Sequence, residues 1–219
     1  MNDKRNLLVT TAREMCRDAL VLGTWGNVSV RADNESMWIT PSGLPYESMT
    51  AGDLVLLRLD GTALSGRWKA SSEWRLHAAL YKARPDCGAI VHTHSVYATA
   101  FAVAHTPVLP VVEDLAQVVG GGVEVAEYAL PGTELLAENA VRALGDRSAV
   151  LLANHGLVGL AGDLSEALKV CRVVEKAAQA LLLARLLGPV QPLSREDVRM
   201  MRDFYLKAYG PGLGGEVSK

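Results

Sequence analysis

The sequence predicts one α/β domain, and three features carry this prediction. The chain has 219 residues, which suits one domain with ample core, and no repeat, low-complexity tract or linker divides it. Short alternating or β-branched apolar runs indicate strands, several of them in the first third. Longer segments with apolar residues at helical spacing follow and indicate helices. We therefore expect a single domain over residues 1–219.

Composition and charge exclude several classes of protein. Hydrophobic residues make up 49% and charged residues 21%, the composition of an ordinary soluble globular protein. The net charge of −2 indicates neither nucleic acid nor a membrane surface as a partner. The N-terminus lacks the apolar core of a signal peptide, and no apolar run reaches the roughly 18 residues that span a bilayer. Three widely spaced cysteines predict reduced thiols in a cytoplasmic protein.

The first third is expected to hold a helix and then strands. Apolar residues recur at helical spacing over residues 6–22 and stop at Gly23. Residues 28–31 and 36–40 form a predicted β-hairpin, and a further strand covers residues 54–59.

Two small, polar loops flank this hairpin. Residues 23–27 are a tight connection that needs the conformational freedom of glycine, or a loop whose backbone N–H groups cradle an anion such as phosphate. Residues 41–45 form a similar loop with hydroxyls and a glycine. By itself, each loop leaves both interpretations open.

A glutamate stands at the start of the next predicted helix, which runs from about residue 71 to about residue 83. Ser71 or Ser72 can serve as the N-cap. Glu73 then falls in the first turn, where the helix dipole favours a negative charge, so a structural role accounts for it. His77, one turn later, is expected to be a structural or surface histidine.

Two histidines end the apolar run 88–91, which is typical of a buried strand. Residues two apart on a strand point the same way, so His92 and His94 form a potential pair of metal ligands. Such a pair can also arise by chance or be hydrogen-bonded within a core. A third ligand is available because the apolar run 149–153 leads into Asn154-His155-Gly156, and site residues often follow buried strands.

The remaining elements are mostly helical. We expect a helix capped by Ser95, an apolar stretch over 110–119 that contains Glu113 and Asp114, and a short strand over 123–128. Further helices are predicted at 134–144, at 165–187 and from Ser194 to Tyr209, before a mobile tail, 210–219. The very apolar helix 165–187 is expected to be buried on more than one side, in the core or against a neighbouring subunit.

Together, these motifs resemble the class II aldolase and adducin family. The resemblance covers nearly the whole chain, from the first helix to Tyr209, with the motifs in order at matching spacing. It implies a three-layer αβα sandwich around a mixed, largely antiparallel sheet, assembled as a homotetramer with sites at subunit interfaces. The motifs that carry it are Gly26-Asn27-Val28-Ser29, Thr40-Pro41-Ser42-Gly43, Ser71-Ser72-Glu73, His92-Thr93-His94 and Asn154-His155-Gly156.

The resemblance also implies roles for individual residues. His92, His94 and His155 would bind zinc, a site that cobalt or manganese could also occupy. Glu73 would be the catalytic carboxylate, a fourth metal ligand at rest and then a base. The residues implied in phosphate binding are Gly26, Asn27, Ser42, Gly43, Ser71 and Ser72.

The resemblance also concerns the part of a sugar phosphate substrate that leaves as an aldehyde, and two positions bear on it. Tyr209 matches a tail tyrosine that handles the aldehyde, and the alternative is an aromatic residue that closes the last helix. A second tyrosine of the family, expected after Leu109-Pro110, is missing, and Glu113-Asp114 stand there instead.

The implied function is a zinc-dependent lyase that cleaves a ketose 1-phosphate, of the L-fuculose 1-phosphate type, to dihydroxyacetone phosphate and an aldehyde. One alternative uses the same enediolate chemistry to decarboxylate a 3-oxo-tetronate 4-phosphate. Epimerisation of ribulose 5-phosphate is disfavoured because those enzymes are longer and carry further catalytic residues. A non-catalytic, adducin-like interaction domain would be marked by loss of the metal ligands, whereas all three histidines and Glu73 are present.

Overall fold

The computed structural model describes residues 2–209, and the tail 210–219, for which the sequence predicts mobility, lies outside the described residues. Its strands are β1 (Asn27–Arg31), β2 (Ser36–Ile39), β3 (Val55–Arg58), β4 (Ala63–Ser65), β5 (Ala89–Thr93), β6 (Val125–Ala126), β7 (Ala149–Leu152) and β8 (Gly156–Ala161). Its helices are α1 (Asn2–Arg17), α2 (Trp74–Ala83), α3 (Val96–Val103), α4 (Glu113–Val119), α5 (Glu134–Leu144), α6 (Leu164–Leu187) and α7 (Arg195–Ala208).

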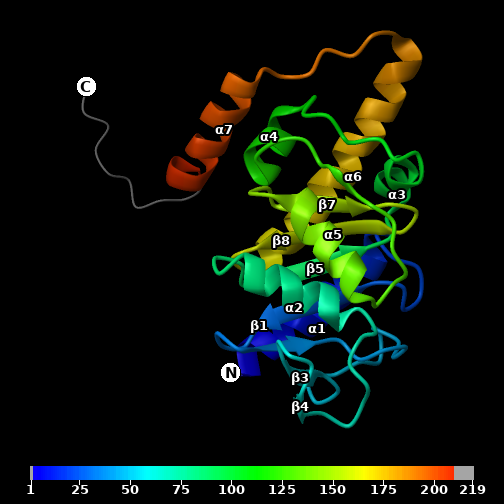
Figure 1. Cartoon of the computed structure of the whole chain (residues 1–219), viewed down its shortest axis with the longest axis vertical. Coiled ribbons are helices and arrows are strands. Elements are labelled where there is room, and N and C mark those ends of the chain that lie inside the picture. Colours follow the sequence, from blue (N-terminus) through cyan, green and yellow to red (C-terminus); the bar gives the residue numbers. More distant parts are fainter. Residues whose placement is uncertain (1, 210–219) are drawn as a thin grey trace.

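The strands form one sheet in the order β4-β3-β2-β1-β5-β8-β7-β6. Figure 1 shows β7, β8, β5, β1, β3 and β4 following one another from top to bottom. All neighbouring strands are antiparallel except β6 and β7, which are parallel. The expected mixed, largely antiparallel sheet is therefore confirmed.

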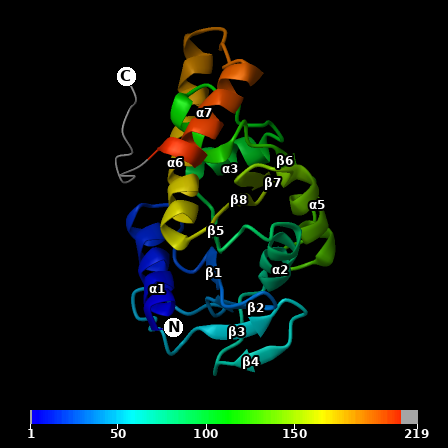
Figure 2. The same ribbon diagram turned by 90° about the vertical axis from the view of Figure 1, so that its left-hand side faces the viewer.

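Helices cover both faces of this sheet, and Figure 2 shows α1 and α6 on one side and α2 and α5 on the other. Buried residues form two separate clusters, one beneath α1, α3, α4 and α6 and the other beneath α2 and α5. Strands β5 and β7 are buried along their whole length because helices pack on both of their faces, which explains their continuous apolar sequences. This arrangement is the predicted three-layer sandwich.

The first helix ends at Arg17, five residues earlier than the sequence pattern predicts. Ala19 adopts a left-handed conformation (φ 55°), which stops the helix before Leu20. The carbonyl of Leu20 then accepts a hydrogen bond of 3.0 Å from the backbone N–H of His94. The sequence pattern places the apolar residues 20–22 in the helix, but they form a turn that reaches the end of β5.

Strand β8 is absent from the sequence-based prediction, although it is central to the sheet. It pairs with β5 on one side and with β7 on the other. The turn between β7 and β8 is short and passes through Asn154, which has a positive φ of 55°. This hairpin places residues 153–155 beside the end of β5.

No helix within residues 2–209 combines the length and the apolar character needed to cross a membrane.

We predict that Leu151→Ala lowers the free energy of unfolding by about 2–5 kcal/mol, because Leu151 is fully buried in β7 and its removal leaves a cavity between the sheet and the helical layer that contains α3 and α6. Leu22→Ala is the matched control, since Leu22 is 85% exposed and should change the value by less than about 0.5 kcal/mol. Urea denaturation at one protein concentration measures both. Equal effects of the two substitutions would contradict the placement of β7 in the core.

Candidate metal centre and active site

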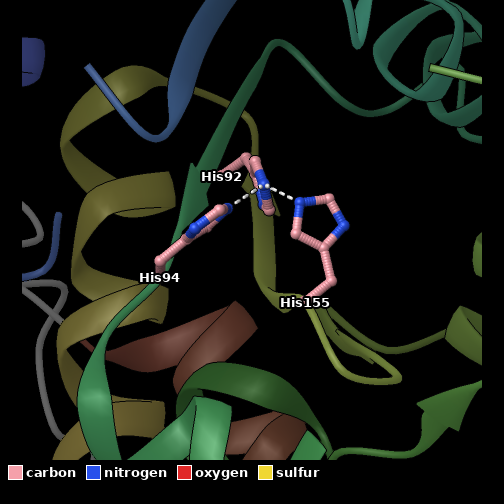
Figure 3. A group of neighbouring side chains, drawn as sticks. All are labelled: His92, His94 and His155. Carbon is pink, nitrogen blue, oxygen red and sulfur yellow. Dashed lines mark hydrogen bonds between the residues drawn. The ribbon is translucent and has the colours of Figure 1, made fainter. Parts of the chain in front are cut away.

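Three imidazoles meet at one end of the central strands (Figure 3). His92 is the fourth residue of β5, His94 follows the end of that strand, and His155 comes from the β7–β8 turn. The Nε2 atom of His92 lies 3.0 Å from Nε2 of His94 and 3.3 Å from Nε2 of His155. The ligand atoms of the group all lie within 4.8 Å of one another, so this group could hold a metal ion.

The backbone beside the cluster leaves room only for glycine at position 156. A Cβ atom there would lie 2.4 Å from the Thr93 carbonyl oxygen and 2.9 Å from Cδ2 of His94. The hairpin can therefore approach the end of β5 closely, which brings His155 to the two histidines of the other strand. Gly156 is therefore required for His155 to reach the other two histidines.

The ring nitrogens of the cluster can direct lone pairs at a cation between them. Nδ1 of His92 lies 3.0 Å from the Leu157 carbonyl oxygen and donates to it, so a neutral ring would direct the Nε2 lone pair at the other two rings. Burial and the positive charge of His92 lower the pKa of His94 to about 3 and that of His155 to about 4. These two rings are therefore neutral at pH 7, the form that binds metal.

Glu73 lies against the same cluster. One carboxylate oxygen is 3.1 Å from Nε2 of His92 and the other is 3.4 Å from Nε2 of His155. Burial by itself would raise the pKa of Glu73, but the positive charge and hydrogen bond of His92 lower it below its usual value. Burial likewise opposes charge on His92, yet Glu73 raises its pKa. Each of these two groups therefore favours the charged form of the other.

The position of Glu73 differs from the one predicted. It is the N-cap residue of α2 and not a first-turn residue, and its side chain makes no capping hydrogen bond. Its backbone N–H donates to the Ser71 hydroxyl at 3.3 Å, while its carboxylate turns toward the histidines. The helix-dipole interpretation therefore does not explain this side chain, which is only 6% exposed.

A cavity of about 340 Å³ opens onto Glu73, His94 and His155. Its walls include all six residues expected to bind phosphate, namely Gly26, Asn27, Ser42, Gly43, Ser71 and Ser72. Five further residues line it, namely Thr24, Trp25, Pro41, Pro131 and Asn154. All but Pro131 lie in the two loops or the Asn154-His155-Gly156 motif that the sequence singles out, although the sequence predicts no individual role for them. A large aromatic residue inside a glycine-rich loop was the available signal for Trp25, which is 66% exposed.

Tyr209 is not brought to this cavity within one chain. It lines a different cavity of about 540 Å³ together with Cys87 and Gly162, which lie by the opposite end of β5. Its ring stacks on that of Tyr205, with the ring centroids 5.2 Å apart.

The two acidic residues that replace the missing tyrosine also lie outside the cavity. Glu113 and Asp114 form the first turn of α4, where the helix dipole stabilises negative charge. The Asp114 carboxylate forms an ion pair with Lys176 of α6. Within one chain, the helix start and the ion pair therefore account for these two residues without a contact to the cavity.

The three imidazoles could hold a metal ion beside the Glu73 carboxylate, and the adjoining cavity leaves the cluster open on one side, whereas a structural metal site is closed by its ligands. Residues 6–182 match the sequence model of the family described as the class II aldolase and adducin N-terminal domain. The chain belongs to this family, and its curated relatives are aldolases, which are lyases.

Two curated relatives show how far the similarity extends. The L-fuculose phosphate aldolase of Escherichia coli strain K12 is 38% identical over 204 residues, which cover 93% of this chain and 94% of the relative. The 5-deoxy-D-ribulose 1-phosphate aldolase of Bacillus thuringiensis is 36% identical over 199 residues, 90% of this chain and 93% of the relative.

Solved structures agree with the sequence relatives. An L-fuculose 1-phosphate aldolase superimposes with a TM-score of 0.90 at 35% identity, covering 94% of this chain and 97% of that one. YgbL of Klebsiella pneumoniae, whose activity is left open among aldolase, epimerase and decarboxylase, gives a TM-score of 0.82 at 29% identity, covering 91% and 98%.

We predict that His92→Ala lowers the affinity for zinc by orders of magnitude, because it removes the central nitrogen of the cluster. Competition with a chromophoric chelator measures the affinity. His105→Ala is the control, because His105 is exposed and its ring contacts Asn154 and not the cluster. Unchanged zinc binding by His92→Ala would remove this residue from the ligand set.

Proposed function

We propose that this protein is a zinc-dependent class II aldolase that reversibly cleaves a ketose 1-phosphate of the L-fuculose 1-phosphate type. The products are dihydroxyacetone phosphate and an aldehyde. The observation that carries this proposal is one cavity lined by Glu73, by two of the three clustered histidines and by all six residues of the expected phosphate site. The names of the relatives support the same substrate class.

His92, His94 and His155 would hold the metal ion. Zinc suits three imidazoles, and it would supply a Lewis acid that stabilises the negative charge developing on the substrate carbonyl oxygen. Cobalt and manganese are also compatible with these ligands. Since neutral imidazoles contribute no charge, they would leave the full charge of the ion available to the substrate.

Glu73 would move the proton of the reaction. In the direction of cleavage, the hydroxyl of the carbon that becomes the aldehyde loses its proton as the carbon–carbon bond breaks, and the Glu73 carboxyl would return a proton to the carbon from which the aldehyde leaves. In the direction of synthesis, its carboxylate would remove that proton from dihydroxyacetone phosphate. Glu73 is buried, and burial by itself raises the pKa of its carboxyl, which would make the carboxylate a stronger base for this step.

The phosphate would lie among the two small loops and the start of α2. Ser71 and Ser72 precede that helix, whose free N–H groups and dipole favour an anion. Gly26, Ser42 and Gly43 line the same cavity and would add backbone and hydroxyl contacts. These contacts barely change during the reaction, so they would hold the substrate in position.

We further propose a cytoplasmic homotetramer. The C-terminal half of α6 exposes four leucines that would suit a subunit contact, namely Leu182, Leu183, Leu186 and Leu187. Sites between subunits would allow Tyr209 to act at the aldehyde end of a neighbouring site. The free thiols of the three cysteines agree with a reducing compartment.

A second candidate function is the decarboxylation of a 3-oxo-tetronate 4-phosphate. The similarity to YgbL supports it, because decarboxylase activity is among those considered for that protein. The two reactions share the phosphate site and the enediolate chemistry but differ in the group that leaves. Carbon dioxide in place of an aldehyde would identify this reaction.

The proposed function is tested with the zinc-loaded protein and a panel of ketose 1-phosphates and one 3-oxo-tetronate 4-phosphate. We expect dihydroxyacetone phosphate from at least one ketose 1-phosphate, and we expect a chelator to abolish its formation. Release of carbon dioxide alone would replace the aldolase by the decarboxylase. Absence of both products from zinc-loaded protein would contradict the proposed substrate class.

We predict that Glu73→Gln lowers kcat by about 10²–10⁴-fold, because the amide cannot accept the proton. Zinc content should be retained, since three imidazoles remain. Glu47→Gln on the surface is the matched control and should leave kcat unchanged. Near-normal turnover of Glu73→Gln would leave this residue with a structural role only.

A further inference from the structure

A chain of hydrogen bonds leads from the interior of the domain to Glu73. The hydroxyls of Tyr81 and Ser29 are 2.9 Å apart, and the Ser29 hydroxyl lies 2.6 Å from Nδ1 of His77. Nε2 of His77 lies 2.5 Å from the side-chain oxygen of Asn27, whose amide nitrogen donates to Glu73 at 3.0 Å. The chain therefore ends on the carboxylate beside the histidine cluster.

Two regular spacings build this chain. Asn27 and Ser29 are two residues apart on β1, so both side chains point to the same face of the sheet. Glu73, His77 and Tyr81 are four residues apart along α2, so they follow one another on one side of that helix. The face of the strand and the side of the helix meet, and the contacts alternate between them.

The five side chains are almost completely shielded from water. Ser29 and His77 are 0% exposed and Tyr81 is 1% exposed, while Asn27 and Glu73 are 3% and 6% exposed. A buried polar group without a partner is costly, so each of these contacts needs a donor and an acceptor. His77 was expected to be a structural or surface histidine, and complete burial excludes the surface.

Chemistry sets the direction of the donors. An ionised carboxylate only accepts, so Asn27 must turn its NH₂ group to Glu73 and its oxygen to His77. His77 must then carry its proton on Nε2, which leaves Nδ1 to accept from the Ser29 hydroxyl. Burial and the positive charge of His92 lower the pKa of His77 to about 3, so the ring is neutral and one tautomer satisfies both neighbours.

We propose that His77 is a positioning residue for the reaction, and this rests on the proposed role of Glu73. Its Nε2–H group fixes the amide of Asn27, and that amide holds the Glu73 carboxylate in the orientation needed for proton transfer. The oxygen of Asn27 fixes the proton of His77 on Nε2, Ser29 donates to Nδ1 of the same ring, and Tyr81 donates to Ser29. These two bonds use one N–H and the oxygen of the Asn27 side chain, which leaves its second amide N–H for a phosphate contact.

Two substitutions of His77 separate positioning from packing. In His77→Gln, the longer side chain can place its NH₂ group where Nε2–H was, so the donor to Asn27 is retained. In His77→Asn, the shorter side chain places its amide near Nδ1, so that donor is lost. We expect His77→Asn to lower kcat by about 10–100-fold with little change in KM or zinc content. We expect His77→Gln to restore most of kcat.

Further variants test the rest of the chain. Ser29→Ala removes the hydroxyl that donates to Nδ1 of His77 and should lower kcat while zinc stays bound. Tyr81→Phe removes the donor to Ser29 at the far end of the chain and should lower kcat less than Ser29→Ala does. Ser29→Ala keeps the test valid if His77→Asn does not fold.

Nitrogen-15 NMR of the imidazole rings supplies a readout that is independent of turnover. In the zinc-loaded wild-type protein, the His77 signals, assigned by their absence from His77→Gln, should show a protonated Nε2 and an unprotonated Nδ1. A proton on Nδ1 would overturn the inferred chain whatever the substrate. Normal kcat in both His77→Asn and Ser29→Ala would overturn the positioning role. A wild-type protein without turnover on any of the sugar phosphates would instead contradict the proposed aldolase function, and the positioning role with it.

Discussion

The Nε2 atoms of His92, His94 and His155 lie close together, and Glu73 lies against two of them. Lone pairs of neutral imidazoles repel one another, so such an arrangement needs a positive charge at its centre. Burial opposes charge on His92 and Glu73, yet the contact between them raises the pKa of His92 and lowers that of Glu73. A divalent cation fits the centre of the arrangement, and competition between ion and proton would make metal binding weaker as the pH falls.

The fold holds these groups in place by joining segments that are distant in sequence. Strand β5 lies between β1 and β8, so the end of β5 lies beside the β7–β8 turn on one side and the loop before β1 on the other. Gly156 permits the close approach of the hairpin, and the early end of α1 lets the Leu20 carbonyl bind the His94 backbone. Helix α2 begins near the end of β5 and the start of β1, which places Glu73 at the cluster. His77, one turn further along the helix, is directed to β1.

Much of this site could be predicted from the sequence because its residues stand at marked positions. His92 and His94 end an apolar run, His155 is followed by glycine, and Glu73 starts a helix after two serines. The burial of His77 could not be predicted, because four-residue spacing from Glu73 indicates a shared side of a helix but not what covers that side. Strand β8 was missed because Gly156 and Gly159 interrupt its apolar pattern and because it needs the partners β5 and β7.

The end of α1 and the position of Tyr209 depend on tertiary contacts, which local sequence patterns do not contain. Residues 20–22 continue the apolar pattern of α1, yet the left-handed conformation of Ala19 ends the helix to suit a contact with His94. Tyr209 lines a cavity by the opposite end of β5, and sequence spacing does not predict this position either. Its role in catalysis stays a prediction.

The central claim is that Glu73 exchanges a proton with the substrate next to the metal-binding cluster. Incubating the zinc-loaded protein with dihydroxyacetone phosphate in deuterated water, without any aldehyde, isolates this step, and NMR follows the exchange at the hydroxymethyl carbon. The account predicts stereospecific loss of one hydrogen in the wild-type protein, with no such exchange in Glu73→Gln or after chelation. Equal exchange in the wild-type protein and in zinc-loaded Glu73→Gln would contradict it.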